Sequence, residues 1–218
     1  MKYSILRTLS LVILSLTVVL PLIAQNQDSK ASSAIAGLAS DIRGCKNMRI
    51  EFVYKMDNES SKIHESKQGT LLVQGEKYRL NIEGQMIIND GKAIYAYLPE
   101  AKEVQINPLD EDSQSLTPTG ILADYEKKYR VKYIREEKVG VRNVMVVDLI
   151  PKEGKKFFKV RIRLDTRTRQ PISFAMYEKS GNVFSYEINR LDQNIAMKPG
   201  MFEFKTTDYP GVDVVDMR

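Results

Sequence analysis

The chain has 218 residues, of which 28% are charged and 43% hydrophobic, and this balance suits one large globular domain rather than a disordered chain. The formal net charge is +5, but the cations are dispersed among acidic residues without a long lysine or arginine block. Because nucleic-acid binding needs cations gathered on one face, we expect no nucleic-acid partner. Cys45 is the single cysteine, which excludes an intramolecular disulfide and indicates a small buried thiol near a helix end.

Residues 1–24 have the order of a secretory signal peptide. Lys2 and Arg7 precede an apolar run, and Ala24 stands at the boundary to a polar stretch. This order predicts export and cleavage after Ala24, which leaves residues 25–218 as a soluble periplasmic chain of net charge +3. The alternative is an uncleaved anchor, but the uninterrupted run is shorter than the ~20 residues of a membrane-spanning helix. No cysteine directly follows the run, which argues against a lipid anchor.

The segment after the leader is predicted to be a helix over residues 31–43. Its apolar residues Ile35, Leu38 and Ile42 recur at spacings of three and four, as on one face of a helix. Gly44 is a typical helix stop.

Most of the remaining chain alternates apolar and polar residues with a period of two, which is typical of strands with one buried face. Turn residues such as Asn89-Asp90-Gly91 and Ser180-Gly181-Asn182 separate the segments. The pattern predicts about eleven strands in an antiparallel meander. The apolar positions that define them are Ile50/Phe52/Tyr54/Met56, Gly69/Leu71/Val73, Tyr78/Leu80/Ile82, Met86–Ile88, Ala93–Leu98, Val104/Ile106, Tyr129/Val131/Tyr133, Met145/Val147/Leu149, Phe158/Val160/Ile162/Leu164, Ile172/Phe174/Met176 and Phe184/Tyr186/Ile188.

One stretch, residues 108–128, lacks this alternation. It begins with an acidic run, Asp110–Asp112, and we expect a loop followed by a short helix with Ile121, Leu122 and Tyr125 on one side. Both predicted helices must bury an apolar side, and the apolar face of the sheet is the available partner.

A sheet of this size twists and curls toward a barrel. Two short helices are little material to cover its apolar face, so either the sheet closes on itself or a hollow apolar interior remains between the sheet and the helices. The alternative is a fully packed core, and periodicity leaves these possibilities open. The predicted fold is therefore mainly β, a curved antiparallel sheet with the two helical segments on its concave side. If a cavity exists, its lining is predicted to be Phe52, Tyr54, Leu71, Leu80, Ile82, Ile88, Met145, Val147, Phe158, Val160, Ile162, Phe174 and Phe184, with Ile35 and Leu38 from the first helix. Where both neighbours are apolar, as at Leu71-Leu72 and Met86–Ile88, a shift of one residue inverts the assignment.

Catalytic and metal-binding patterns are missing from the sequence. His64 is the single histidine and lies in a polar run, so neither a serine–histidine relay nor a Cys45–His64 pair has a local signature. There is no cluster of histidine and cysteine for a metal and no glycine-rich phosphate loop. Asp110–Asp112 lacks the spacing of a calcium loop. We therefore expect a binding protein without catalytic residues, metal or cofactor.

The chain resembles the outer-membrane lipoprotein carrier family, the LolA-like periplasmic chaperones, along nearly all of residues 25–218. The resemblance lies in the order and spacing of Met48–Phe52, Gly69–Val73, Ile88–Pro99, Phe202–Phe204 and Tyr209–Val214. It implies a monomeric half-barrel covered by helices, whose cavity receives the acyl chains of lipoproteins. The implied partners are an inner-membrane ATP-driven lipoprotein-releasing complex and an outer-membrane receptor or acceptor membrane.

One position departs from the family. Members often carry an arginine early in the third strand that holds the helices over the cavity, whereas the aligned residue here is Gly75 and the nearest arginine is Arg79. The same half-barrel also occurs in sensor or regulatory modules that bind lipids or lipidated ligands, which is the alternative function.

Overall fold

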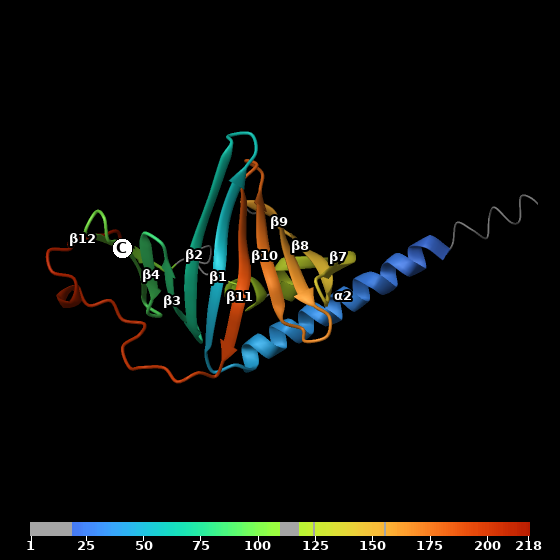
Figure 1. Ribbon diagram of the computed structural model, residues 1–218, viewed down its shortest axis with the longest axis horizontal. Helices are drawn as coiled ribbons and strands as arrows, with labels where there is room; N and C mark the ends of the chain where they lie inside the picture. The colour runs from blue at the N-terminus through green and yellow to red at the C-terminus, as the bar shows by residue number, and fades with distance from the viewer. Residues whose placement is uncertain (1–18, 110–117, 124, 155) are drawn as a thin grey trace, which may run out of the picture.

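The computed structural model describes residues 19–109, 118–123, 125–154 and 156–218. Twelve strands form one open, curved sheet in the order β12-β6-β5-β4-β3-β2-β1-β11-β10-β9-β8-β7 (Figure 1). The elements are α2 (Val19–Gly44), β1 (Met48–Asn58), β2 (Ile63–Gln74), β3 (Lys77–Ile82), β4 (Gln85–Asn89), β5 (Ala93–Leu98), β6 (Glu103–Pro108), α4 (Pro118–Ala123), α5 (Tyr125–Lys128), β7 (Tyr129–Val139), β8 (Arg142–Pro151), β9 (Phe157–Asp165), β10 (Pro171–Glu178), β11 (Val183–Gln193), a 3₁₀ turn (Thr206–Asp208) and β12 (Asp213–Asp216). The predicted curved antiparallel sheet is confirmed.

The chain builds the sheet in two runs that meet at β1. Strands β1 to β6 follow one another outward, while β7 starts at the opposite edge and β8 to β11 return until β11 pairs with β1. The stretch that lacks alternation, residues 108–128, is thus the connection from one side of the sheet to the other. Its acidic run, residues 110–112, lies outside the described residues.

The first helix is longer than predicted, since α2 begins at Val19 rather than at residue 31. Residues 25–30 are polar and show no apolar spacing, so nothing in the sequence marks them as helical. In the fold they contact the edge strand β7: Asp28 Oδ1 accepts a hydrogen bond from the backbone N–H of Tyr133 at 2.7 Å, and Lys30 Nζ lies 2.7 Å from Glu136 Oε1. Within the described residues, no helix combines the length and apolar character needed to cross a bilayer.

The helices lie on one side of the sheet, which we call the inner face. Beneath them is a helix-covered cluster of buried side chains that joins α2, α4 and α5 to β7–β10. Its central members are Ile35, Leu38, Ile121, Leu122, Tyr125, Met145, Val147, Val160, Ile162 and Phe174. The predicted contact of both helical segments with the apolar face is therefore confirmed.

The outer face is covered in part by the segment that follows β11. Phe204 and Tyr209 from this segment stack on each other with ring centroids 4.8 Å apart, and they contact Tyr95 and Tyr97 of β5. The segment then ends in β12 (Figure 1), and β12 pairs in parallel with β6. The prediction of about eleven strands missed this twelfth, parallel strand, because its four residues are exposed and show no alternation between a buried and a solvated side.

Candidate functional site

The inner face continues beyond the helices across β11, β1, β2, β3 and β4. The register aligns its apolar residues: Phe52 stands opposite Gly69, and Leu71 lies between Ile50 and Leu80. These side chains form a second group, the open cluster. It comprises Met48, Ile50, Phe52, Leu71, Val73 and Tyr78, with the less buried Tyr54, Leu80, Ile82, Ile87, Tyr186, Ile188 and Leu191 packed around it.

A glycine shapes this surface. An added Cβ at Gly69 would lie 2.4 Å from Phe52 Cζ, so the Phe52 ring occupies the space that a side chain at position 69 would take. Phe52 in turn meets Tyr186 edge to face at 5.3 Å, and Tyr186 lies 5.5 Å from Tyr54. Phe52, Tyr54 and Tyr186 therefore form a continuous aromatic surface over β1, β2 and β11.

Exposure divides the predicted lining into two sets. Seven of the fifteen residues lie in the helix-covered cluster, where they are nearly inaccessible: Ile35, Leu38, Met145, Val147, Val160, Ile162 and Phe174. Phe52 and Leu71 are buried in the open cluster. Tyr54, Leu80, Ile82 and Phe184 are only partly buried on the inner face. An apolar surface available to a ligand is therefore concentrated outside the helix-covered cluster.

Ile88 was predicted to line the cavity, and the structure contradicts this. Its register partners are Arg79 and Tyr95, which places it on the outer face, while the neighbouring Ile87 pairs with Leu80 on the inner face. Ile88 is fully buried all the same, because the outer face is itself covered here. Because both faces of the sheet are covered here, Ile87 and Ile88 are both apolar, and alternation could not decide which of them points to the inner face.

Phe158 was also assigned to the wrong face. It is 46% exposed and contacts Tyr177 of β10 with ring centroids 6.2 Å apart. A register shift opposite Tyr177 and Glu178 breaks the alternation, and Phe157 turns inward to stack on Tyr129. The sequence signal was the pair of adjacent phenylalanines, since only one of two adjacent strand residues points inward and the bulge decides which one.

The boundary between the helices and the open cluster contains a cavity of about 240 Å³. Ile42, Cys45 and Leu122 line it from the helix side, and Val73 and Gly75 from the sheet. Gly75 lies in the β2–β3 turn with φ +59° and has open space at the position of a Cβ. The boundary between the helices and the sheet therefore has a gap at Gly75.

Arg79, the nearest arginine, does not reach this boundary. It lies on the outer face, where its guanidinium donates to the Met201 carbonyl at 3.4 Å and contacts Met86 Sδ at 2.9 Å. Arg79 thus holds the C-terminal segment and is no latch for the helices. Cys45 is partly buried as expected near the end of α2; its Sγ donates to the Asp41 carbonyl at 3.1 Å, and desolvation raises the pKa of the thiol.

Tyr186 is one of the open-cluster residues that the predicted lining omitted. Burial raises the pKa of its phenol to about 12, with smaller contributions from Tyr54 and Tyr78. A desolvated tyrosine packed against the open cluster marks an apolar environment. Its place in the alternation of β11 could have identified it, since it lies two residues from the predicted Phe184.

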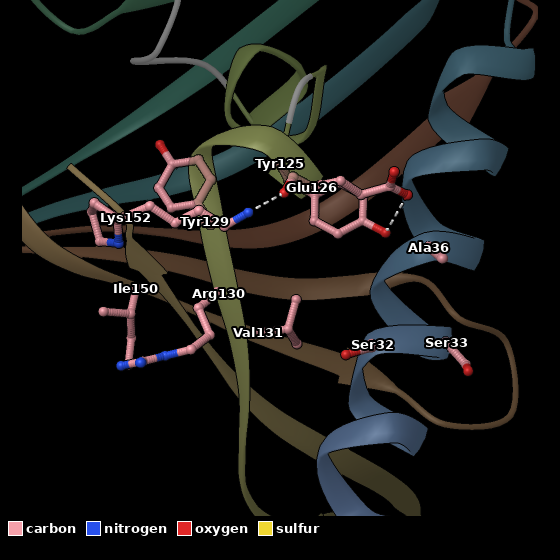
Figure 2. Close-up of a pocket in the computed structure, with 11 residues that line it drawn as sticks. Ser32, Ser33, Ala36, Tyr125, Glu126, Tyr129, Arg130, Val131, Ile150 and Lys152 are labelled. Atoms are coloured by element: carbon pink, nitrogen blue, oxygen red, sulfur yellow. Dashed lines mark hydrogen bonds between the residues drawn. The ribbon is translucent and has the colours of Figure 1, made fainter.

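A second hollow, of about 850 Å³, runs between α2 and the edge strand β7. Figure 2 shows Ser32 on α2 turned toward β7 and Val131 on β7 turned toward α2. One end is closed by α5 and β8, where Lys152 Nζ donates to the Glu126 carbonyl at 2.7 Å and Tyr125 Oη donates to Glu126 Oε1 at 3.1 Å (Figure 2). We call this hollow the edge groove.

Polar chemistry is sparse at the open cluster. His64 lies exposed near the β1–β2 turn, where Nδ1 is 2.9 Å from Asp57 Oδ1 and this hydrogen bond raises the pKa of the imidazole. In the part of the chain that the structure describes, no three histidine, cysteine, aspartate or glutamate side chains gather as metal ligands. The described geometry offers apolar binding surface rather than an acid–base pair.

The fold and this surface define a class: an open antiparallel half-barrel with an apolar inner face partly covered by helices. The sequence profile of the family described as outer membrane lipoprotein carrier protein LolA matches residues 43–205. The chain therefore belongs to this family, as its resemblance implied. The matched range contains the open cluster but leaves out most of α2 and all of β12.

Individual relatives are distant. The chain is similar to an outer-membrane lipoprotein carrier protein of Alkalilimnicola ehrlichii, with 21% identity over 207 residues that cover 91% of this chain and 88% of that one. Among solved structures, an uncharacterized conserved protein from Thermus thermophilus aligns with a TM-score of 0.57 and 9% identity over 85% of this chain and 98% of that one. A putative outer membrane lipoprotein-sorting protein domain from Vibrio parahaemolyticus aligns with a TM-score of 0.45 and 15% identity, over 81% and 97%. At 9% identity, the Thermus thermophilus structure shows the fold alone.

Proposed function

We propose that this protein is a periplasmic carrier that binds the acyl chains of lipoproteins on the open cluster and transports them from the inner to the outer membrane. The observation that supports this is an apolar inner face larger than the area its helices seal. Tyr54, Leu80, Ile82, Ile87 and Tyr186 remain partly accessible, although each lies on the apolar side of its strand. Family membership supports the choice of a lipoprotein as cargo.

The energetics favour a carrier that opens. Burial of an acyl chain contributes about 0.8 kcal/mol per CH₂, so several chains sequestered at no cost would bind too tightly for release. The helix-covered cluster supplies the opposing cost, because α2 must give up contacts of Ile35 and Leu38 with the sheet to admit more cargo. The gap at Gly75 and Leu122 is the natural place for this separation to begin.

The remaining parts of the proposal follow from this role. Residues 1–24 direct export and are removed, and the mature protein acts as a monomer without catalytic residue, metal or cofactor. Its partners are an inner-membrane ATP-driven releasing complex, which loads it, and an outer-membrane receptor or acceptor membrane, which unloads it.

The test is co-purification followed by transfer. The protein is isolated from the periplasm of a Gram-negative host, bound lipoproteins are identified by mass spectrometry, and their release to acceptor vesicles is measured. We expect Leu80→Glu to lose the cargo, because a carboxylate on the open cluster would be desolvated by acyl chains. Asn81→Glu is the matched control, since residue 81 points to the outer face of the same strand and cargo should stay bound.

Two outcomes would contradict the proposal. Loss of cargo in both variants, or in neither, would mean that the open cluster does not bind it. Capture of a membrane regulator without any delivery of lipoprotein would instead indicate the sensor function.

A further inference from the structure

The edge groove exposes unpaired backbone groups of β7, and three observations fix which ones. Lys152 N–H donates to the Lys128 carbonyl at 2.9 Å, so the pair 128/152 is hydrogen-bonded across β7 and β8. In an antiparallel ladder such pairs alternate, which makes 129/151, 131/149 and 133/147 the non-bonded pairs. The N–H of Tyr133 indeed points away from β8, because it donates to Asp28.

Val131 lies between the two ends of this edge. Tyr133 is capped by Asp28 of α2, and the opposite end is closed by α5, whose residues continue directly into β7. By the same alternation, the N–H and C=O of Val131 point out of the sheet, and the described residues offer them no hydrogen-bond partner. From Tyr129 to Tyr133 the strand spans roughly 13 Å, at about 3.3 Å per residue.

The chemistry of the groove suits a peptide better than a lipid tail. An acyl chain over Val131 would bury an N–H and a C=O without partners, which costs free energy. An extended peptide would instead pair with both groups as an added strand. The Ser32 hydroxyl on α2 and the exposed Arg130 add polar contacts along the same groove.

We infer that the edge groove binds an extended segment of the cargo polypeptide adjoining its lipid-modified cysteine, by backbone pairing with Val131. The inference rests on the proposed function. It assigns two recognition surfaces to one cargo: the open cluster takes the acyl chains, and β7 takes the chain to which they are attached. Backbone pairing does not depend on side-chain identity, so one groove can serve cargo proteins of different sequence.

Two probes separate the surfaces: a triacylated cysteine amide, and the same triacylated cysteine followed by an eight-residue serine- and threonine-rich peptide. We expect wild-type protein to bind the lipopeptide about tenfold more tightly than the lipid, as two net hydrogen bonds would give. Val131→Pro removes the outward N–H, and with it one of the two hydrogen bonds, while leaving the ladder to β8 intact; the preference for the lipopeptide over the lipid should fall from about tenfold to about threefold. Val131→Ala keeps the N–H and should retain the tenfold difference.

A measurement on the wild type guards against misfolding of the proline variant. Exchange of the Val131 amide hydrogen, followed by NMR, should slow when the lipopeptide binds and stay unchanged with the lipid alone. Equal affinity of wild type for the two probes, or an amide that stays unprotected, overturns the inference and leaves the proposed function standing. Failure of wild type to bind either probe overturns both.

Discussion

Leu38 tests whether the helices oppose cargo binding. It is 2% exposed in the helix-covered cluster, and its replacement by alanine removes a buried contact between α2 and the sheet. Such truncations cost about 2–5 kcal/mol of folding free energy. If cargo binding separates α2 from the sheet, the bound state does not bear this cost.

The expected gain in affinity follows from that difference. A loss of about 2–3 kcal/mol in the closed state alone corresponds to acyl ligand binding that is roughly 30–150 times tighter, at 1.4 kcal/mol per factor of ten. Fluorescent fatty-acid titration of Leu38→Ala measures the affinity, and urea unfolding measures the stability.

Val146→Ala is the control for a general loss of stability. Val146 is fully buried, but its register partner Arg163 shows that it lies on the outer face, away from the helices. We expect this variant to lose stability without a gain in affinity. Should Leu38→Ala unfold more easily yet bind ligand no better than wild type, the helices do not compete with cargo and our account of release is wrong.

Three further predictions address the walls of the site. Gly69→Ala should displace the Phe52 ring and lower the free energy of unfolding by about 1–3 kcal/mol, and Phe52→Leu in the same chain should restore part of it, as denaturant titration would show. The raised pKa of Tyr186 means that the folded protein keeps the phenol proton above the ordinary pKa of about 10, where the unfolded chain has lost it. Stability should therefore fall as the pH rises from about 10 toward 12, and less so in Tyr186→Phe; equal slopes for the two proteins would refute this. Arg79→Ala should speed proteolysis between β11 and β12 while acyl binding is unchanged, because Arg79 lies on the outer face and bonds the C-terminal segment at Met201 as well as Met86; a parallel loss of binding would show that it also acts on the inner face.

Much of the fold could be predicted because its signals are local. Turn residues and the period of two act over a few neighbours, and they located the hairpins from β1 to β11. The helix that begins at Val19 could be predicted only from residue 31, where apolar spacing starts. Its polar part is fixed by Asp28 and Lys30, whose partners Tyr133 and Glu136 lie about a hundred residues away in the chain.

The candidate site could be predicted less completely. Thirteen of the fifteen predicted residues lie on the inner face or the helix that covers it, but alternation could not tell a sealed residue such as Val160 from a partly accessible one such as Leu80. That distinction depends on where the helices pack. Alternation also could not assign Ile88 or Phe158 to a face of the sheet. At Ile88 both faces are covered, and at Phe158 a bulge interrupts the period of two.

Strand periodicity and turn chemistry reside in adjacent residues, so the amino-acid pattern is enough to predict an antiparallel sheet with one long apolar face. Packing between distant segments decided how much of that face stays accessible, which of two adjacent apolar residues points inward, and that β12 joins the edge in parallel. It also decided that β7 keeps an unpaired edge beside α2. These features arise from contacts between segments far apart in the chain, and no local pattern records them.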